Sequence, residues 1–195
     1  MVTLVEKGPS PKERLLAAVD ELFYNEGIHT VGIDRVIEKA GVAKGSLYYN
    51  FGGKDDLIGA YLHGRHVAWA ARVDEGIAAH DDPTEKILSV FTTLGELFAE
   101  PAYRGCAFTN AMAESLPDSA ERIAGKTFRA WLHQTFSDLV AALNIADPEA
   151  LTARLIVLYD GANGTAQLDG SSEPARLAGS MAALVMTAAK QPDAD

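Results

Sequence analysis

Helix-start signals recur along this chain, and they constrain its fold more than any other feature. Ser10-Pro11-Lys12-Glu13 places a capping serine before a proline at the first helical position, with a glutamate three residues after the cap. Asp82-Pro83-Thr84-Glu85 repeats this arrangement, and Asp147-Pro148-Glu149 gives a third start. Apolar residues follow at helical spacing, whereas alternating runs typical of strands are absent. The sequence therefore predicts an all-α protein.

About nine helices are expected, because glycine and proline divide the helical pattern into that many segments. Gly27, Gly41 and Gly52-Gly53 end the first three, and Pro101 and Pro117 stop two of the later ones. The expected helices cover roughly residues 11–26, 33–40, 44–51, 54–80, 83–100, 105–116, 119–143, 148–168 and 174–190.

The composition favours a globular protein with a substantial core. The chain has 195 residues, of which 48% are hydrophobic, and that length suits one domain of average size or two small ones. Its single cysteine, Cys106, excludes an intrachain disulfide and a zinc-binding cysteine cluster. The N-terminus lacks the apolar region of a secretory signal, and the uncharged stretch from Leu177 to Ala189 is too short to span a membrane. We therefore expect a cytoplasmic location.

The charge is distributed unevenly. The formal net charge is −10, of which residues 1–60 carry −2 and residues 61–195 carry −8. An acidic chain repels phosphate, yet this repulsion is screened over about 8–10 Å, so a local basic face can still bind DNA. The N-terminal part is therefore the better candidate for contact with nucleic acid.

The segment from Gly32 to Phe51 has the pattern of a helix-turn-helix. Two helices of about two turns each are joined by Gly41-Val42-Ala43, and a glycine in such a turn lets the second helix cross the first steeply. A helix of that width fits the major groove of DNA. The pattern alone is also compatible with a small three-helix bundle that has a solvated polar face.

The outward side of the second helix carries groups suited to DNA. Lys44 offers a positive charge, Ser46 and Asn50 can bond base edges, and tyrosine hydroxyls can bond phosphate. Lys54 begins the next helix, whose first backbone N–H groups can also meet phosphate. The candidate DNA-contacting residues are Gly32, Ala43, Lys44, Gly45, Ser46, Tyr48, Tyr49, Asn50 and Lys54.

The stretch from Gly27 to Leu62 closely resembles the DNA-binding domain of the TetR family of bacterial transcription regulators. The core A-G-V-x-K-G-x-L-Y-x-x-F, from Ala40 to Phe51, and the following Lys54-Asp55-Asp56-Leu57 carry the resemblance. It is tight over residues 11–65, and Arg104-Gly105-Cys106-Ala107-Phe108 is similar to a segment of some branches. Two departures stand out: Tyr49-Asn50 replaces basic or histidine residues, and Gly52-Gly53 replaces a proline or polar cap.

The resemblance implies a homodimeric regulator that is not an enzyme and needs no cofactor or metal. Two recognition helices would read a near-palindromic double-stranded operator, and a small, mostly apolar molecule would release a repressor from it. An N-terminal DNA-binding domain would span residues 10–55. A larger helical ligand-binding and dimerisation domain would span residues 56–190.

Two sets of candidate residues lie in the C-terminal region. The family's dimer contact uses the last two helices, which here carry apolar residues on more than one side. The candidates for it are Leu158, Leu177, Met181, Leu184 and Val185. The candidates for a ligand cavity, each equally compatible with plain core packing, are His66, Trp69, Phe91, Phe108, Asn110, Met112, Trp131, Tyr159 and Asn163.

Other functions receive less support from the residues. A helical enzyme would need a perturbed acid–base pair, and no such pattern is present. His63 and His66 lack further metal ligands at matching spacing, so a solvated helix face is the simpler interpretation. A ligand-binding or adaptor protein whose helix-turn-helix docks protein, and a thiol-based sensor that uses Cys106, stay open as alternatives.

Overall fold

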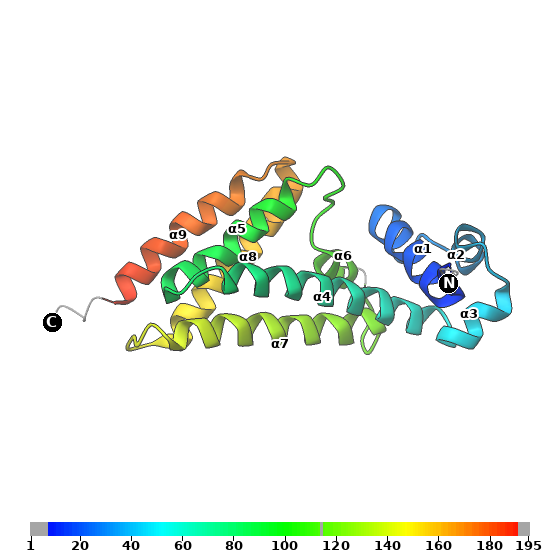
Figure 1. The fold of residues 1–195 in the computed structure, drawn as a ribbon, viewed down its shortest axis with the longest axis horizontal. Helices are drawn as coiled ribbons and strands as arrows, with labels where there is room; N and C mark the ends of the chain where they lie inside the picture. The colour runs from blue at the N-terminus through cyan, green and yellow to red at the C-terminus, as the bar shows by residue number, and fades with distance from the viewer. Residues whose placement is uncertain (1–7, 114, 191–195) are drawn as a thin grey trace, which may run out of the picture.

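The computed structural model describes residues 8–113 and 115–190, and every regular element within them is an α-helix (Figure 1). The helices are α1 (Pro11–Glu26), α2 (Ile33–Ala40), α3 (Lys44–Phe51), α4 (Lys54–Ala78), α5 (Pro83–Phe98), α6 (Ala107–Ala113), α7 (Ala120–Ala141), α8 (Pro148–Asp169) and α9 (Glu173–Ala189). The all-α prediction is confirmed. The helix expected over residues 105–116 is shorter, and residue 114 at its end lies outside the described residues.

Local capping explains where several helices begin. The Ser10 hydroxyl accepts a hydrogen bond from the Glu13 backbone N–H at 3.3 Å, and the Glu13 carboxylate accepts one from the Ser10 N–H at 2.7 Å. This is a complete capping box, and the pKa of Glu13 is lowered because its carboxylate accepts hydrogen bonds from the Ser10 backbone and side chain, which favour the charged form. The side chains of Asp82 and Asp147 accept hydrogen bonds from backbone N–H groups in the first turns of α5 and α8, each before a proline.

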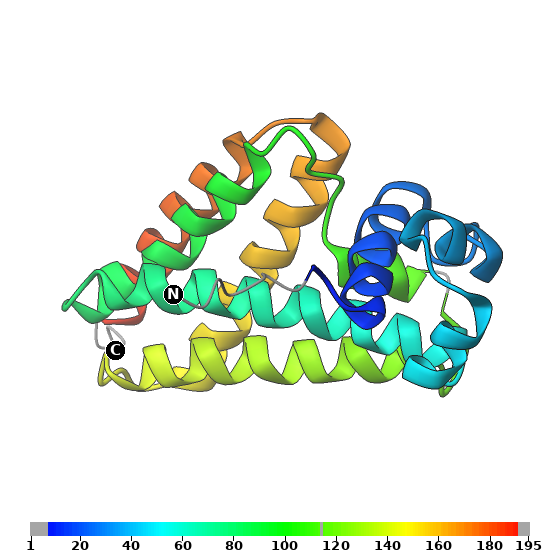
Figure 2. The ribbon, with the colours of Figure 1, turned by 45° about the vertical axis from the view of Figure 1, so that its right-hand side comes forward.

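The molecule is elongated, with α1, α2 and α3 grouped at one end (Figure 1). Helices α4 and α7 run side by side along its length, and α5, α8 and α9 pack together at the other end (Figure 2). The buried apolar side chains form one continuous cluster from α1 to α9. The two ends therefore share a core instead of meeting through a linker.

Helix α4 passes through the boundary that we expected between two domains. It has 25 residues, or a length of about 37 Å, and residues 55 and 56 lie in its first turn. Leu57 and Tyr61 are buried in the N-terminal half of α4, whereas Trp69 and Val73 are buried further along it. One helix thus contributes to the core at both ends of the molecule.

Candidate nucleic-acid interface and ligand cavities

The turn between α2 and α3 is held to α1 by one side chain. Gly41 ends α2 in the left-handed conformation at a φ of 62°, and its carbonyl accepts a hydrogen bond from Arg14 Nη1 at 3.0 Å. Val36, Ala40 and Leu47 are buried beneath the turn. These contacts fix the angle at which α3 crosses α2, so the outer side of α3 faces away from the core.

The candidate DNA-contacting residues are all exposed or half-buried. The Tyr48 side chain is 46% exposed and that of Tyr49 is 90% exposed. A Cβ atom added at Gly45 would meet no atom within 4 Å, so another surface can approach the α3 backbone closely there. The remaining candidates with the same accessibility are Gly32, Ala43, Lys44, Ser46, Asn50 and Lys54.

Two of these side chains already have partners within the N-terminal helices. Lys44 Nζ lies 3.2 Å from a carboxylate oxygen of Asp34, and both side chains are well exposed. Asn50 Nδ2 donates to the Ser46 carbonyl at 2.7 Å, which leaves its Oδ1 without a hydrogen bond within the described residues. An exposed ion pair is weak, so Lys44 can exchange Asp34 for a phosphate at little cost.

Helices α2, α3 and α4 begin without a side-chain cap. Their N-cap residues are Gly32, Ala43 and Gly53, none of which makes a cap hydrogen bond. A serine or an aspartate caps α1, α5, α7 and α8, whereas Ser172 at the start of α9 also makes no side-chain cap hydrogen bond. The first backbone N–H groups of an uncapped helix have no intrahelical partner and attract anions. From the sequence we noted the missing cap before α4, and we named Gly32 and Ala43 as contacts without using the missing caps before α2 and α3 as a signal.

A pocket that we call the inner cavity lies between α4, the α5–α6 connection and α8. Its volume is about 160 Å³. Four of the candidate ligand-binding residues meet on its walls: Trp69, Phe108, Tyr159 and Asn163. Its other lining residues, which sequence reasoning did not assign to a cavity, are Tyr24, Arg65, Ala68, Arg72, Leu97, Glu100, Gly105, Cys106, Ala107 and Phe128.

None of the other five candidates lines the inner cavity. Phe91 packs against Phe136 with 6.0 Å between ring centroids, beside a separate groove between α5 and α9. Met112 lies over Gly125, where an added Cβ would come within 2.5 Å of its sulfur. Trp131 lies beside His66 at 5.1 Å between ring centroids. Helical spacing alone does not separate such core contacts from cavity walls.

His66 belongs to an aromatic cluster and lines a groove between α4 and α7. Its ring packs edge-on against Phe128 at 5.7 Å, and Phe128 stacks on Phe108 at 4.0 Å. Burial lowers the pKa of His66 below its usual value, and the positive charge of His63 lowers it further. The neutral imidazole is therefore the favoured form in this cluster.

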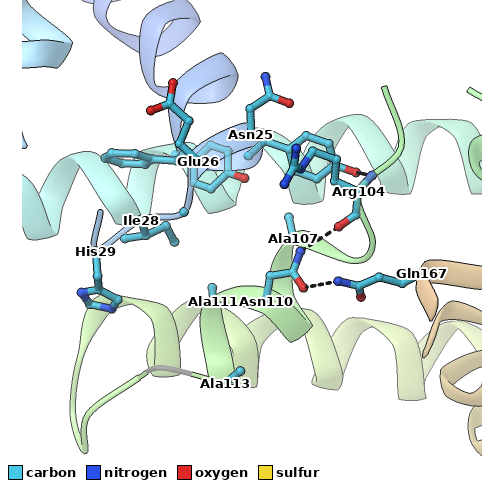
Figure 3. A pocket seen from close by; sticks show the side chains of 14 residues that line it. Asn25, Glu26, Ile28, His29, Arg104, Ala107, Asn110, Ala111, Ala113 and Gln167 are labelled. Atoms are coloured by element: carbon cyan, nitrogen blue, oxygen red, sulfur yellow. Dashed lines mark hydrogen bonds between the residues drawn. The ribbon is translucent and has the colours of Figure 1, made fainter. Parts of the chain in front are cut away.

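A second pocket, the junction cavity, lies where the end of α1 faces α6 (Figure 3). Its volume is about 340 Å³. Asn110 lies on its wall, where Nδ2 donates to the Arg104 carbonyl and Oδ1 accepts from Gln167 Nε2, both at 3.0 Å (Figure 3). Asn110 therefore belongs to this cavity and not to the inner one.

Tyr24 of α1 lines both cavities and ties α1 to the α5–α6 connection. Its hydroxyl accepts a hydrogen bond from the Arg104 backbone N–H at 2.9 Å and donates one to the Gly105 carbonyl at 3.0 Å. The Arg65 guanidinium stacks over the Tyr24 ring at 4.0 Å and pairs with Asp20 at 2.6 Å. A change in the inner cavity can therefore reach α1 through direct contacts.

A second contact between distant segments involves a buried acid. Glu121, in the first turn of α7, is buried, and its carboxylate lies 3.3 Å from His29 Nε2 in the α1–α2 connection. A buried carboxylate needs such a partner because burial otherwise disfavours its charge. This pair therefore holds the N-terminal helices to α7 in addition to α4.

The outer faces of α8 and α9 are unusually apolar for exposed surface. Leu177, Met181 and Leu184 of the candidate dimer set are exposed, and Leu184 is 64% exposed. Leu158 and Val185, by contrast, are half-buried against the core of the same chain. Val157 and Leu168 of α8, which we had not named, are exposed instead. These outward-facing residues could not be identified from the sequence, because the helical spacing of apolar residues does not fix which side of a helix faces the core of its own chain.

Some features are absent from the described part of the chain. Residues 8–113 and 115–190 contain no group of three or more histidine, cysteine, aspartate or glutamate side chains that could hold a metal ion. Within the same residues, none of the helices is both long and apolar enough to cross a membrane. Cys106 is half-buried in the wall of the inner cavity, and its role as a thiol sensor stays a prediction.

Comparison with known proteins finds one matching family model and several similar regulators. Residues 15–61 match the family model described as bacterial regulatory proteins, tetR family. The regulator LmrA of Bacillus subtilis (strain 168) is 30% identical over 89 residues, which are 45% of this chain and 47% of LmrA. A regulator in the lacX 3′ region of Lactococcus lactis subsp. lactis is 26% identical over 132 residues. The chain covers 63% of that protein's length, so it spans only about half to two thirds of these relatives.

Two solved structures are similar over nearly the whole chain. SCO4454, a TetR-family transcriptional regulator from Streptomyces coelicolor, is 32% identical with a TM-score of 0.84, and the match covers 93% of this chain and 96% of that one. A regulator (sav143) from Streptomyces avermitilis MA-4680 is 28% identical with a TM-score of 0.80, and the match covers 94% of this chain and all of that one.

Proposed function

The chain belongs to the TetR family of bacterial transcription regulators, and on that basis we propose that it is a homodimeric repressor whose operator affinity is set by a small molecule in the inner cavity. It is a transcriptional regulator with a DNA-binding helix-turn-helix, and it is not an enzyme. In this proposal residues 10–55 bind DNA and residues 56–190 bind the effector and the second subunit. Helix α4 joins the two parts.

The observation that carries the DNA-binding surface is that three consecutive helices, α2, α3 and α4, begin without a side-chain cap. The starts of α2, α3 and α4 offer uncapped backbone N–H groups to phosphate, and the exposed tyrosines of α3 lie beside them. Phosphate contacts set the position of a protein on DNA, and side chains in the major groove then read bases. Tyr48, Tyr49 and Asn50 are the side chains that we assign to the groove.

The exposed apolar residues of α8 and α9 support the dimer. Leu177, Met181 and Leu184 are exposed on α9, and this helix lies at the end of the molecule opposite α1–α3 (Figure 1). A patch of this kind is typical of a surface that another protein covers. Two subunits joined there would each present one α3, as binding to a near-palindromic operator requires.

The contacts of Tyr24 support a response to ligand. An effector in the inner cavity lies against Tyr24 and Gly105, so its binding favours a different position of α1 relative to the α5–α6 connection. A coupling of about 1–3 kcal/mol between the two sites would change operator affinity by roughly 5- to 150-fold. The effector would be mostly apolar, because aromatic side chains form much of the wall.

The DNA-binding proposal is tested by measuring the affinity of the full chain for the DNA upstream of its own gene over a series of salt concentrations. We expect Lys44→Ala to weaken binding and to reduce the slope of log affinity against log salt by about 1, since one phosphate contact is lost. Tyr49→Ala should also weaken binding, and its side chain is too exposed for the change to affect folding.

The matched control is Lys126→Ala, which removes the same charge from the exposed surface of α7. Its affinity should stay nearer that of the unchanged protein because Lys126 lies on α7, outside the helix-turn-helix. If Lys44→Ala and Tyr49→Ala both bind DNA with the affinity of the unchanged protein, α3 is not the recognition helix. If the folded dimer binds no DNA, the adaptor alternative gains support.

A further inference from the structure

The junction cavity lies where the N-terminal helices meet the rest of the chain, and the proposed function does not use it. Its wall is formed by the end of α1, Tyr61 of α4, the α5–α6 connection, α6 and Gln167 of α8. Its volume of about 340 Å³ falls within the range of small-molecule sites, which begins at about 300 Å³. A molecule bound there would contact several separate segments of the chain at once.

The backbone of Arg104 is fixed at the edge of this cavity from two sides. Its N–H donates to the Tyr24 hydroxyl of α1 at 2.9 Å, and its carbonyl accepts from Asn110 Nδ2 of α6 at 3.0 Å (Figure 3). Asn110 is held in turn by Gln167 of α8, whose Nε2 donates to Asn110 Oδ1 at 3.0 Å. The Arg104 side chain therefore extends from a rigid point, which favours a binding group with a defined geometry.

The guanidinium of Arg104 differs from those of the arginines that line the inner cavity. Arg65 Nε lies 2.6 Å from an Asp20 carboxylate oxygen, and Arg72 Nη1 lies 2.6 Å from one of Glu100. Arg104 is exposed, and no carboxylate oxygen in the described part of the chain lies within 4.0 Å of its nitrogens. Among the described contacts, Arg104 is thus the arginine of the two cavities that is left free to bind an anion.

The other charged groups of the junction cavity do not cancel this positive charge. Glu26 also lines the cavity, but both of its carboxylate oxygens lie 2.8 Å from the Arg35 guanidinium. His29 Nε2 lies 3.3 Å from the buried carboxylate of Glu121, which is not part of the wall. A cationic ligand would therefore meet Arg104 without compensation, whereas an anionic ligand would gain a partner.

Part of the wall is apolar and made of small side chains. Phe23, Ile28 and Ala111 are buried and line the cavity together with Ala107 and Ala113. The three alanines of α6 occupy little of the space between α6 and the end of α1. The cavity thus combines a free cation with an apolar surface, and a carboxylate on a small hydrocarbon body has the matching chemistry.

We propose that the junction cavity binds a small organic monocarboxylate, whose carboxylate pairs with the Arg104 guanidinium and whose hydrocarbon part packs against Phe23, Ile28 and Ala111. The planar guanidinium can donate two parallel hydrogen bonds to the two oxygens of a carboxylate. A dicarboxylate fits less well, because its second charge would enter an apolar wall without a partner. The site is separate from the inner cavity, and a bound ligand would hold the end of α1 against α6 and α8.

The test compares benzoate with benzamide, two molecules of similar shape that differ in charge. Calorimetric titration of the full-length protein at neutral pH should show benzoate binding about tenfold more tightly, the effect of hydrogen bonds between charged groups. Arg104→Gln removes the charge and leaves the backbone contacts in place, so it should bring the two affinities to within about twofold while benzamide binding is retained. Thermal unfolding verifies that the variant is folded.

The matched control is Arg154→Gln, which removes the same charge from an exposed position nearer the other end of α8 from Gln167. Its preference for benzoate should equal that of the unchanged protein. Equal binding of benzoate and benzamide to the unchanged protein, an unaltered preference in Arg104→Gln, a lost preference in Arg154→Gln, or no binding of either molecule would each overturn the inference.

A second variant, Ala113→Phe, locates the bound molecules. Ala113 is exposed and lines the junction cavity but not the inner cavity, so a ring at this position should abolish the binding of both molecules by occupying their space. Unaltered binding of both molecules to Ala113→Phe would place them elsewhere and overturn the inference.

Because these measurements read binding directly, they are independent of the proposed function. If benzoate binds through Arg104 and the chain binds no operator, the site stands and the proposed function fails. If the chain binds its operator and benzoate shows no preference over benzamide, the proposed function stands and the carboxylate site fails.

Discussion

At the scale of single residues, His66 makes the stability of the protein depend on pH. Its pKa is lowered by burial among Phe108, Phe128 and Trp131, and by His63, from the usual value of 6.5 that the unfolded chain retains. Between these two pKa values the unfolded state binds more protons, so stability is fully present above about pH 6.5 and falls as the pH drops through the folded pKa. Thermal unfolding of His66→Phe should lose less stability between about pH 7 and about pH 5 than the unchanged protein. An identical pH dependence in the two proteins would contradict this assignment.

The sequence predicted which types of residue would line a cavity better than it predicted which residues would contact one another. The aromatic residues Trp69, Phe108 and Tyr159 were expected in a cavity because apolar rings are typical of cavity walls, and the structure brings them together. Tyr24 was not expected there, since its partners Arg104 and Gly105 lie about 80 positions away in the sequence. No local pattern encodes a contact of that separation.

At the scale of elements, two adjacent glycines before α4 should respond to substitution in opposite ways. Gly53 has extended backbone and open space around an added Cβ, so Gly53→Ser should cap α4 and stabilise the protein by about 0.5–1 kcal/mol. Gly52 has a φ of 66°, and an added Cβ would lie 2.6 Å from the Asp56 carboxylate. Gly52→Ser should therefore destabilise the protein by about 1 kcal/mol or more. Denaturant unfolding of both variants measures the difference, and equal shifts of the same sign would show that backbone conformation does not set the response.

Helix boundaries were largely predictable because their signals are local. The capping box at Ser10, the prolines of α5 and α8, and Gly27 and Gly41 each act within one turn of the chain. α6 was less predictable, since it has only seven residues and no strong cap pattern of its own. Its position depends instead on packing against α7, with Met112 over Gly125.

At the scale of the whole molecule, the apolar face of α8 and α9 predicts the effect of a charge on assembly. Leu184→Glu should convert the proposed dimer into a monomer, because a carboxylate in a closed apolar interface loses its hydration without a partner. Sedimentation velocity measures the change. The matched control is Ile123→Glu on α7, where the side chain is 61% exposed and should leave the dimer intact. A dimer that persists with Leu184→Glu, or is lost with Ile123→Glu, would place the subunit contact elsewhere.

The faces of helices could be predicted only where one side is clearly polar. α9 is apolar on more than one side, so the sequence did not separate Val185, which packs inward, from Leu184, which is exposed. The same ambiguity placed Leu158 in the expected contact instead of Val157. Which side turns inward is decided by packing against α5 and α7, and those contacts join distant parts of the chain.

Helix α4 runs unbroken from Lys54, next to the proposed DNA-binding surface, to Trp69 in the wall of the inner cavity, where we propose that the effector binds. Thermodynamic linkage between two such sites is reciprocal: if the effector lowers affinity for DNA by some factor, DNA lowers affinity for the effector by the same factor. A dimer bound to a high-affinity operator would therefore need a higher effector concentration to be released. Promoters with operators of graded strength would then be vacated one after another as the effector dose rises, with a single protein setting the order.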